Sequence, residues 1–337
     1  MPLLAGRYRV GAVVGRGGSA AVHRGFDCSL RRPVAIKIMH GPDGAGVSTP
    51  LAEARTAASL SHPNVARIYD FGAAVVDGSK APFLVMEYLP DGTLADLLKR
   101  NGPLSLAEAA AVGADVAAAL ASAHERGIVH RDVKPKNVML ARGGAKLVDF
   151  GVATSSHEKP VDADGRVWGT PAYSAPEQLM GERSLPAADV YALGVLLHEC
   201  LTATPPWQGC SPEQVLIDRH LRPVPTLPSP QDHPPEFVDL YERCLSPRPG
   251  KRPSAAEAAQ ALRRVARGRP LPSRPVVHRA TKPLALAAAC AAVAALIAGL
   301  LVTQNVSDGP GEAGWRSPDV AATVADDASS HPDSAQA

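Results

Sequence analysis

The eight residues HRDVKPKN, His130–Asn137, are the stretch from which the fold of this chain can be decided. They place one carboxylate, Asp132, and one carboxamide, Asn137, five residues apart on what we expect to be a tight loop. The letters DFG, Asp149–Gly151, begin twelve residues after Asn137. The segment MLARGGAKLV between them has two short apolar arms around a Gly-Gly pair, which predicts a hairpin.

A glycine-rich segment lies far upstream of this loop, GRGGSAAV at Gly15–Val22. Small residues let backbone N–H groups approach phosphate oxygens, although a plain glycine-rich hairpin turn gives the same letters. The letters VAIK, Val34–Lys37, follow in a β-rich run, and Glu53 comes next in a segment with a helical pattern. A glycine-rich loop, a strand lysine and a helix that carries Glu53, in this order, favour a phosphate site over a solvated lysine.

The chain is rich in strands first and in helices afterwards. Residues Tyr8–Asp27 alternate apolar and polar side chains around glycines, which predicts strand, turn and strand, and residues 82–89 read as a buried strand. Beyond about residue 94 the pattern is helical. In the segment that follows, Ser105 is a candidate N-cap with Glu108 as its capping-box partner, and Gly127 is the candidate C-cap. The order predicts an α+β arrangement of two lobes.

Composition sets the broad class of the protein. A net charge of +2 with 20% charged residues suits neither a nucleic-acid binder nor an acidic shell, so we expect no nucleic-acid partner. The apolar fraction of 45% is sufficient for a core. The five cysteines are scattered without a CxxC pair, which predicts a reducing compartment with no disulfide framework and no zinc site. No long apolar run begins the chain, so no signal peptide is expected.

Residues 284–302 form a candidate membrane span, because these nineteen residues contain no charge and no proline. As a helix they would extend about 28 Å, close to the roughly 30 Å of a bilayer core. Their eight Leu, Ile and Val residues contribute roughly −2.5 to −5 kcal/mol to insertion. A buried helix of a soluble protein is the alternative. The basic flank and the acidic tail favour a span that leaves residues 1–283 in the cytoplasm.

Small residues recur at every fourth position of this segment, at Ala287, Ala291, Ala295 and Gly299. Such a stripe permits close packing of two helices, so a homodimer is one hypothesis. Eleven of the nineteen residues are Ala, Gly or Cys, however, and chance gives such a stripe easily. The 35 residues at 303–337 are acidic and polar, which predicts a short disordered extracytoplasmic tail and no folded external sensor.

The letters APE, Ala175–Glu177, close the segment that DFG opens. With these motifs in order, the chain resembles the eukaryotic-like (Hanks-type) protein kinases, and most closely the bacterial membrane serine/threonine protein kinases. The resemblance covers about residues 8–267 and implies a bilobal protein-kinase fold. The implied parts are a β-rich N-lobe at about 8–86, a helical C-lobe at about 90–267, a basic Pro-rich juxtamembrane linker at 268–283, one C-terminal transmembrane helix at 284–302 and the tail at 303–337.

The resemblance also implies an activity, the transfer of the γ-phosphate of ATP to Ser or Thr hydroxyls of protein substrates with Mg²⁺ (or Mn²⁺). Asp132 would be the catalytic base, and Lys134 is typical of the serine/threonine class. Asn137 and Asp149 would be the metal ligands. Lys37 would hold ATP and pair with Glu53. The full set of implied nucleotide-binding residues is Val14, Gly15, Gly17, Gly18, Ser19, Val22, Ala35, Lys37, Glu53, Met86, Glu87, Leu89 and Met139.

Two further residues would belong to the framework of the large lobe. The motif DVYALG begins at Asp189, which the resemblance expects to brace the catalytic loop. Arg252, in SPRPGKRPS, is expected to pair with Glu177 of the APE letters as a buried ion pair. Surface charges without such partners are the alternative.

The segment between DFG and APE raises a question of regulation. Arg131 precedes the catalytic aspartate, and many kinases with such an arginine require negative charge in this segment. Related bacterial kinases commonly carry T-x-T where this chain has Asp162-Ala163-Asp164. The two carboxylates would supply constitutive charge, about one unit each against about −1.5 to −2 for a phosphate. An unconstrained polar loop is the alternative, and Thr170, like the hydroxyls of residues 154–156, remains a candidate phosphorylation site.

Two rival functions share the fold. A pseudokinase or ATP-binding scaffold at the membrane would bind nucleotide without transfer, but every charged group that transfer needs is present. A small-molecule phosphotransferase would carry the same Asp and Asn, whereas APE, Lys134 and the GTP letters ending at Pro171 favour protein substrates. We therefore expect a single-pass membrane kinase with its catalytic domain in the cytoplasm, acting in signal transduction.

Overall fold

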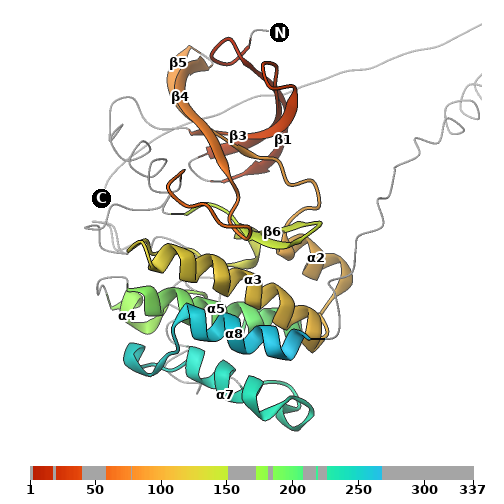
Figure 1. The fold of residues 1–337 in the computed structure, drawn as a ribbon, viewed down its shortest axis with the longest axis vertical. Helices are drawn as coiled ribbons and strands as arrows, with labels where there is room; N and C mark the ends of the chain where they lie inside the picture. The colour runs from red at the N-terminus through yellow and green to blue at the C-terminus, as the bar shows by residue number, and fades with distance from the viewer. Residues whose placement is uncertain are drawn as a thin grey trace, which may run out of the picture. The chain divides into compact units, whose positions relative to one another are not determined.

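A five-stranded antiparallel sheet in the order β1-β2-β3-β5-β4 forms the N-terminal part of the structure (Figure 1). The computed structural model describes residues 3–17, 20–39, 58–76, 78–150, 172–180, 185–207, 218 and 226–267. These residues fall within one compact unit, Met1–Arg274. The strands are β1 (Tyr8–Arg16), β2 (Ala20–Asp27), β3 (Arg32–Met39), β4 (Ile68–Val76) and β5 (Ser79–Glu87).

The two faces of this sheet carry different side chains. Alternate residues of a strand point to opposite faces, so Val34 and Ile36 of β3 pack with Val85 of β5 in the main core of the lobe. Ala35 faces the other way and packs with Met86 in a smaller apolar cluster. Lys37 shares the face of Ala35 by the same alternation, which places its side chain on the side of the smaller cluster.

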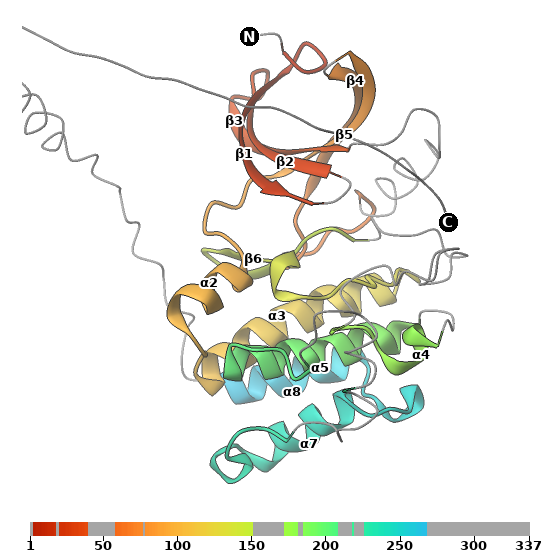
Figure 2. The same cartoon turned by 180° about the vertical axis from the view of Figure 1, so that it is seen from behind.

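The C-terminal part is helical, with one small hairpin at its junction with the sheet (Figure 2). Helix α3 lies against both α5 and α8, and α7 packs on α5 and α8. The elements are α2 (Leu94–Asn101), α3 (Leu106–His124), the 3-10 turn Pro135–Asn137, β6 (Val138–Ala141), β7 (Gly144–Leu147), α4 (Pro176–Leu179), α5 (Pro186–Thr202), the 3-10 turn Pro230–Asp232, α7 (Pro235–Cys244), the 3-10 turn Pro249–Lys251 and α8 (Ala255–Ala266).

Helix α3 begins as the sequence predicts. Ser105 is its N-cap and accepts from the N–H of Glu108, whose carboxylate accepts in return from Ser105, so the capping box is confirmed. The predicted C-cap is wrong by two residues, because the helix is capped by Glu125. Gly127 follows in the turn with φ +69°, a left-handed conformation that glycine adopts without strain.

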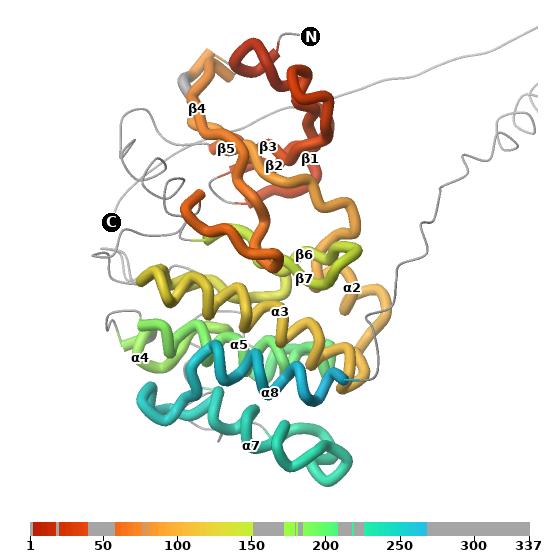
Figure 3. Tube along the Cα trace, viewed as in Figure 1, coloured from red at the N-terminus to blue at the C-terminus, as the bar shows by residue number. Residues whose placement is uncertain are grey.

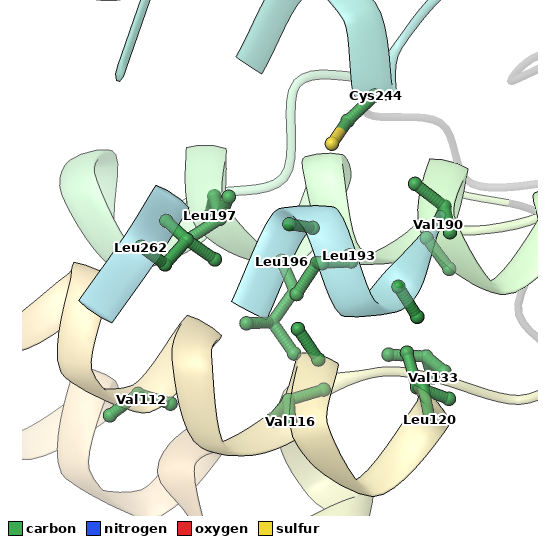
Figure 4. Close-up of a cluster of buried hydrophobic side chains, with 14 of the residues drawn as sticks. Val112, Val116, Leu120, Val133, Val190, Leu193, Leu196, Leu197, Cys244 and Leu262 are labelled. Carbon is green, nitrogen blue, oxygen red and sulfur yellow. The ribbon is translucent and has the colours of Figure 1, made fainter. Parts of the chain in front are cut away.

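Small residues on α3 allow the helices to approach closely. A Cβ atom added to Gly113 would lie 2.6 Å from Cδ2 of Leu197 on α5 and 3.1 Å from Cδ1 of Leu262 on α8. Figure 4 shows the buried cluster at this contact, where valines and leucines of α3, α5 and α8 interdigitate and Cys244 of α7 lies nearby. A side chain at position 113 would force these helices apart.

Among the described residues, α3 is also the helix with the length and apolar composition to cross a membrane. Its apolar surface has another explanation, since 61% of its most apolar window is buried inside the domain. The predicted span at 284–302, the linker at 268–283 and the tail at 303–337 lie outside the described residues.

The arrangement is α+β, with a β-rich N-lobe followed by a helical C-lobe, which confirms the bilobal fold expected from the sequence. Figure 3 follows the chain from β5 into α2 and α3 and back to the hairpin β6–β7, which lies between the sheet and the helices. The loop before this hairpin, residues 130–137, therefore stands at the junction of the lobes.

Candidate active site

Asp189 anchors the loop that carries the HRDVKPKN letters. It lies in the first turn of α5, where its buried carboxylate accepts from the backbone N–H groups of His130 and Arg131, each at 2.8 Å. Nε2 of His124, at the end of α3, lies 2.8 Å from the same carboxylate. The expected bracing of the loop by Asp189 is confirmed. Two backbone donors on one carboxylate fix the loop more tightly than a single side-chain contact would.

His130 connects this loop to the DFG letters. Its Nδ1 accepts from the N–H of Asp132 at 3.2 Å, so the proton is on Nε2, which donates to the carbonyl of Val148 at 2.9 Å. The ring of Phe150 meets the imidazole edge to face, with centroids 4.6 Å apart. The ring thereby holds the backbone before Asp149 in place.

Asp132, Lys134 and Asn137 form one hydrogen-bonded cluster. Nδ2 of Asn137 donates to the carbonyl of Asp132 at 2.7 Å and to its Oδ2 at 2.8 Å. Nζ of Lys134 lies 2.8 Å from Oδ1 and 2.7 Å from Oδ2 of the same carboxylate. A partly exposed carboxylate oriented by an ammonium and an amide is placed to receive a proton from a hydroxyl group. The three residues belong to a tight turn, as the sequence predicts.

Lys37 reaches Asp149 from the N-lobe. Its Nζ donates to Oδ1 of Asp149 at 2.8 Å, and the two side chains are 9% and 30% exposed. The sequence-based expectation pairs Lys37 with Glu53, which lies outside the described residues. Asp149 has φ +62° and Arg131 has φ +69°, so two non-glycine residues of this cluster have a left-handed backbone. Such conformations concentrate at functional sites.

The register of the sheet aligns the predicted nucleotide residues. Gly15 of β1 is opposite Val22 of β2, Val22 is opposite Lys37 of β3, and Ala35 is opposite Met86 of β5. Directly opposed residues share a face, so these side chains line the sheet surface next to the smaller apolar cluster. Val14 of β1 is largely exposed. Gly17 follows β1 and hydrogen-bonds the carbonyl of Ala20 at 2.9 Å; Gly18 and Ser19 lie outside the described residues.

The connection between the lobes begins at Glu87 and includes the buried Leu89. The N–H of Glu87 donates to the carbonyl of Arg67 at 2.9 Å, which continues the pairing of β5 with the segment before β4. Met139 of β6 bridges to Thr93, and Leu140 N–H donates to the carbonyl of Gly92 at 2.9 Å. The strand of Met139 is thus paired with residues 92–93, which follow the connection between the lobes.

Asn137 and Asp149 provide oxygen donors of the kind that Mg²⁺ binds. The N–H of Val148 donates to the carbonyl of Asn137 at 3.0 Å, which links the loops that carry the two residues. Because the amide nitrogen of Asn137 donates to Asp132, its oxygen is the atom left to face a cation. Within the described ranges, no three His, Cys, Asp or Glu side chains are grouped to hold a metal. Two ligands, completed by phosphate oxygens and water, fit Mg²⁺.

Arg252 and Glu177 form the buried ion pair that the family resemblance implies. The guanidinium nitrogens lie 2.5 Å and 2.8 Å from the two carboxylate oxygens, and the side chains are 0% and 4% exposed. Arg252 also donates to the carbonyls of Ala187 and Ser246, at 3.0 Å and 2.9 Å. The pair joins the APE letters to the start of α5 and to the turn before α8.

The sequence did not reveal two pairs near the site. The hydroxyl of Tyr173 donates to Glu199 of α5, and burial together with the Glu199 carboxylate raises the pKa of Tyr173. Lys146 of β7 forms an ion pair with Glu87. Neither pair has a recognisable spacing, because each joins distant segments. Of the predicted regulatory residues, Arg131 lies in the braced loop, whereas Asp162, Asp164 and Thr170 lie outside the described residues.

Comparison with known proteins gives concordant matches. A family model described as a protein kinase domain matches residues 8–262. The serine/threonine-protein kinase PknB of Mycobacterium leprae is 38% identical over 278 residues, which cover 80% of this chain and 44% of that protein. The serine/threonine-protein kinase PknA of Mycobacterium tuberculosis is 37% identical over 324 residues, 94% of this chain and 74% of that protein. The chain thus spans less than half the length of the PknB relative.

Proposed function

The chain belongs to the protein kinase family, and we propose that it is a serine/threonine protein kinase that transfers the γ-phosphoryl group of ATP to hydroxyl groups of proteins. The observation that carries the proposal is the cluster of Asp132, Lys134 and Asn137, held on a loop that Asp189 braces. The similarity to serine/threonine kinases supports the class of acceptor.

The proposed roles follow from the contacts. Asp132 orients the substrate hydroxyl and accepts its proton, while Lys134 carries positive charge beside the attacking oxygen and the transferred group. Asn137 and Asp149 bind the cation, and Lys37 binds phosphate oxygens. ATP would supply the phosphoryl group when bound, and Mg²⁺ (or Mn²⁺) would neutralise the negative charge that develops on it. The contacts among Lys37, Asp132, Lys134, Asn137 and Asp149 support these roles.

The adenine site is proposed to lie between the sheet and the hairpin. The shared face of Val22, Ala35 and Met86 in the sheet supports this proposal, in which Val14, Val22 and Ala35 line the sheet side, Met86 lies at the back and Met139 forms the floor. Backbone groups of Glu87 and Leu89 bind the adenine edge. The glycine-rich segment around Gly15 and Gly17 covers the phosphates, together with Gly18 and Ser19, and Glu53 pairs with Lys37.

The test is transfer of radiolabel from γ-labelled ATP to a protein acceptor such as myelin basic protein by the full-length chain. The proposal predicts labelling that requires Mg²⁺ and is lost in Asp132→Asn. A pseudokinase would bind ATP equally in both forms and label nothing. A small-molecule phosphotransferase would consume ATP only with an added small acceptor, so these rivals give separable results.

Attachment to the membrane is a second part of the proposal. It is supported by the uncharged segment 284–302, the seven Lys and Arg residues without acids at 263–282 and the acidic residues after 303. The kinase domain then faces the cytoplasm. Fractionation tests this, because the full chain should stay with membranes after an alkaline wash, whereas residues 1–283 alone should not. A homodimer through the Ala287–Gly299 stripe remains a hypothesis, testable by Ala291→Leu in a crosslinking assay.

The acidic pair Asp162 and Asp164 is proposed to replace phosphorylated threonines. The proposal rests on the sequence, where both residues precede the GTP letters and Arg131 precedes the catalytic aspartate. A carboxylate carries about half the charge of a phosphate, so the replacement would be partial. Thr170 stays a candidate site of modification.

A further inference from the structure

Glu87 and Lys146 form a close ion pair between the two lobes. Nζ of Lys146 lies 2.8 Å from each carboxylate oxygen of Glu87, and the side chains are 19% and 22% exposed. Oε2 of Glu87 also accepts from the N–H of Arg67 at 3.2 Å. Glu87 ends β5 and begins the connection between the lobes, while Lys146 lies on β7 of the C-terminal part. The pair therefore spans the connection from one lobe to the other.

The next residue of the connection is held from the opposite side. The guanidinium of Arg24, on β2, lies over the ring of Tyr88, 5.4 Å from its centroid. Successive residues of extended chain point in opposite directions. Glu87 is accordingly fixed to the C-lobe and Tyr88 to the N-lobe.

Lys146 is directly opposite Met139 in the hairpin β6–β7. Opposed residues of an antiparallel pair share a face, so Met139 and Lys146 point to the same side of the hairpin. One of them is the proposed floor of the adenine site, and the other holds the residue whose backbone is proposed to bind the adenine edge. The cross-strand pair of Met139 and Lys146 thus connects the proposed floor of the adenine site to the backbone proposed to bind the adenine.

Two side chains from other segments hold the hairpin β6–β7 in place. Oδ2 of Asp115, on α3, accepts from the N–H of Ala145 at 2.8 Å, and a Cβ on Gly144 would lie 2.2 Å from that oxygen. Asn64, in the segment before β4, donates from Nδ2 to the carbonyl of Ala145 at 2.9 Å. Lys146 is therefore mounted on a strand with a set position, from which it can determine the position of Glu87.

We propose that Lys146 is a positioning residue for nucleotide binding. It fixes the position of the Glu87 backbone relative to Met139, and this position determines the affinity for the adenine of ATP. The inference rests on the proposed function, since it assumes that adenine binds at this connection. A backbone segment that is fixed before binding does not have to be ordered when the nucleotide binds. Less free energy is then lost on binding, so the affinity is higher. The side chain itself touches neither the nucleotide nor the reacting atoms.

The test compares wild type, Lys146→Met and Lys146→Arg as full-length proteins, with the steady-state constants for ATP and the dissociation constant of a fluorescent ATP analogue. Lys146→Met should raise the KM for ATP and the dissociation constant roughly threefold to tenfold with kcat little changed, because the loop of Asp132 is untouched. Lys146→Arg should stay within about twofold of wild type, since arginine also binds a carboxylate in bidentate fashion. The dissociation constant of free pyrophosphate, which has no adenine, should not change.

A matched control is Arg243→Met, which removes a more exposed ion pair with Asp239 on α7. It should change neither constant. If Lys146→Met lost thermal stability while its KM for ATP stayed at the wild-type value, the role of Lys146 would be purely structural and the proposal would be overturned. So would a drop in kcat without a change in KM. Failure of the wild type to transfer phosphate would count against the proposed function, while the analogue's dissociation constant would still report on Lys146.

Discussion

Lys37 and Asp149 lie 112 positions apart in the sequence and meet in an ion pair of 2.8 Å between Nζ and Oδ1. The contact joins β3 of the sheet to the loop after the hairpin β6–β7. Asp149 is itself tied, through His130 and the backbone of Val148, to the loop of Asp132. The residue proposed to bind phosphate and the residue proposed to bind the cation are thus within one hydrogen bond of each other.

Replacing Lys37 with methionine should remove most of the activity. The substitution keeps an unbranched side chain of similar length and deletes the charge proposed to bind the phosphates. We expect a loss of at least about 100-fold in kcat/KM for ATP, measured by label transfer. Lys99→Met, at an exposed position in the last turn of α2, is the control and should retain activity. Retained activity in Lys37→Met would contradict the assigned role.

Replacing Arg252 with methionine should destabilise the large lobe. The change leaves the buried carboxylate of Glu177 without its bidentate partner, and breaking such a pair costs about 3–5 kcal/mol. Urea unfolding should show the loss in the free energy of unfolding. Arg243→Met, at an exposed pair on α7, should change it by less than about 1 kcal/mol. If the two substitutions lowered the free energy of unfolding equally, the buried pair would stabilise the fold no more than the exposed pair does.

The Arg7–Asp27 pair should make part of the stability depend on acidic pH. Hydrogen bonding to Arg7 at 2.7 Å and 2.9 Å lowers the pKa of Asp27 from 3.8 to about 2. Because the folded-state pKa lies below that of the unfolded chain, the contribution is complete above about pH 4 and is lost as pH falls toward about 2.

The urea midpoint of wild type should therefore exceed that of Arg7→Met by a constant amount from about pH 7 to about pH 5, and the difference should shrink below about pH 4. Arg9→Met, in β1, is the control. The difference in urea midpoint between wild type and Arg9→Met should not vary with pH in this range. A difference between wild type and Arg7→Met that persists unchanged at pH 3 would contradict the assignment.

Replacing Asp164 with asparagine should lower kinase activity if the acidic pair supplies the negative charge that Arg131 requires. The side chain keeps its size and loses its charge, so packing effects are small. Activity of the full-length chain is the measurement, and Asp164→Glu, which keeps the charge, is the control. Unchanged activity in Asp164→Asn would remove the hypothesis of constitutive charge.

The local parts of the site could be predicted from the sequence because their residues are neighbours in the chain. Asp132 and Asn137 share one turn, and their spacing alone places them together. The bracing of this turn by Asp189 and the ion pair of Arg252 were expected only from family resemblance, since no spacing rule links such distant positions. The capping box of Ser105 follows from local hydrogen bonds.

Other features depend on how distant segments pack. The pairing of Lys146 with Glu87 requires the register of the hairpin against the connection, which no local pattern contains. The apolar composition of α3 resembles that of a membrane span, and only its burial against α5 and α8 distinguishes the two. The C-cap of α3 is Glu125 and not Gly127, which shows that a glycine indicates the region where a helix ends more reliably than the exact residue.

The most direct test of the central claim is transfer of γ-labelled phosphate from ATP to protein by the purified full-length chain, followed by identification of the labelled amino acids. The account predicts phosphoserine or phosphothreonine in wild type, dependent on Mg²⁺, and at least about a 100-fold loss in Asp132→Asn. Both proteins should bind ATP. Equal labelling by wild type and Asp132→Asn, or no labelling by a wild type that binds ATP and Mg²⁺, would contradict it.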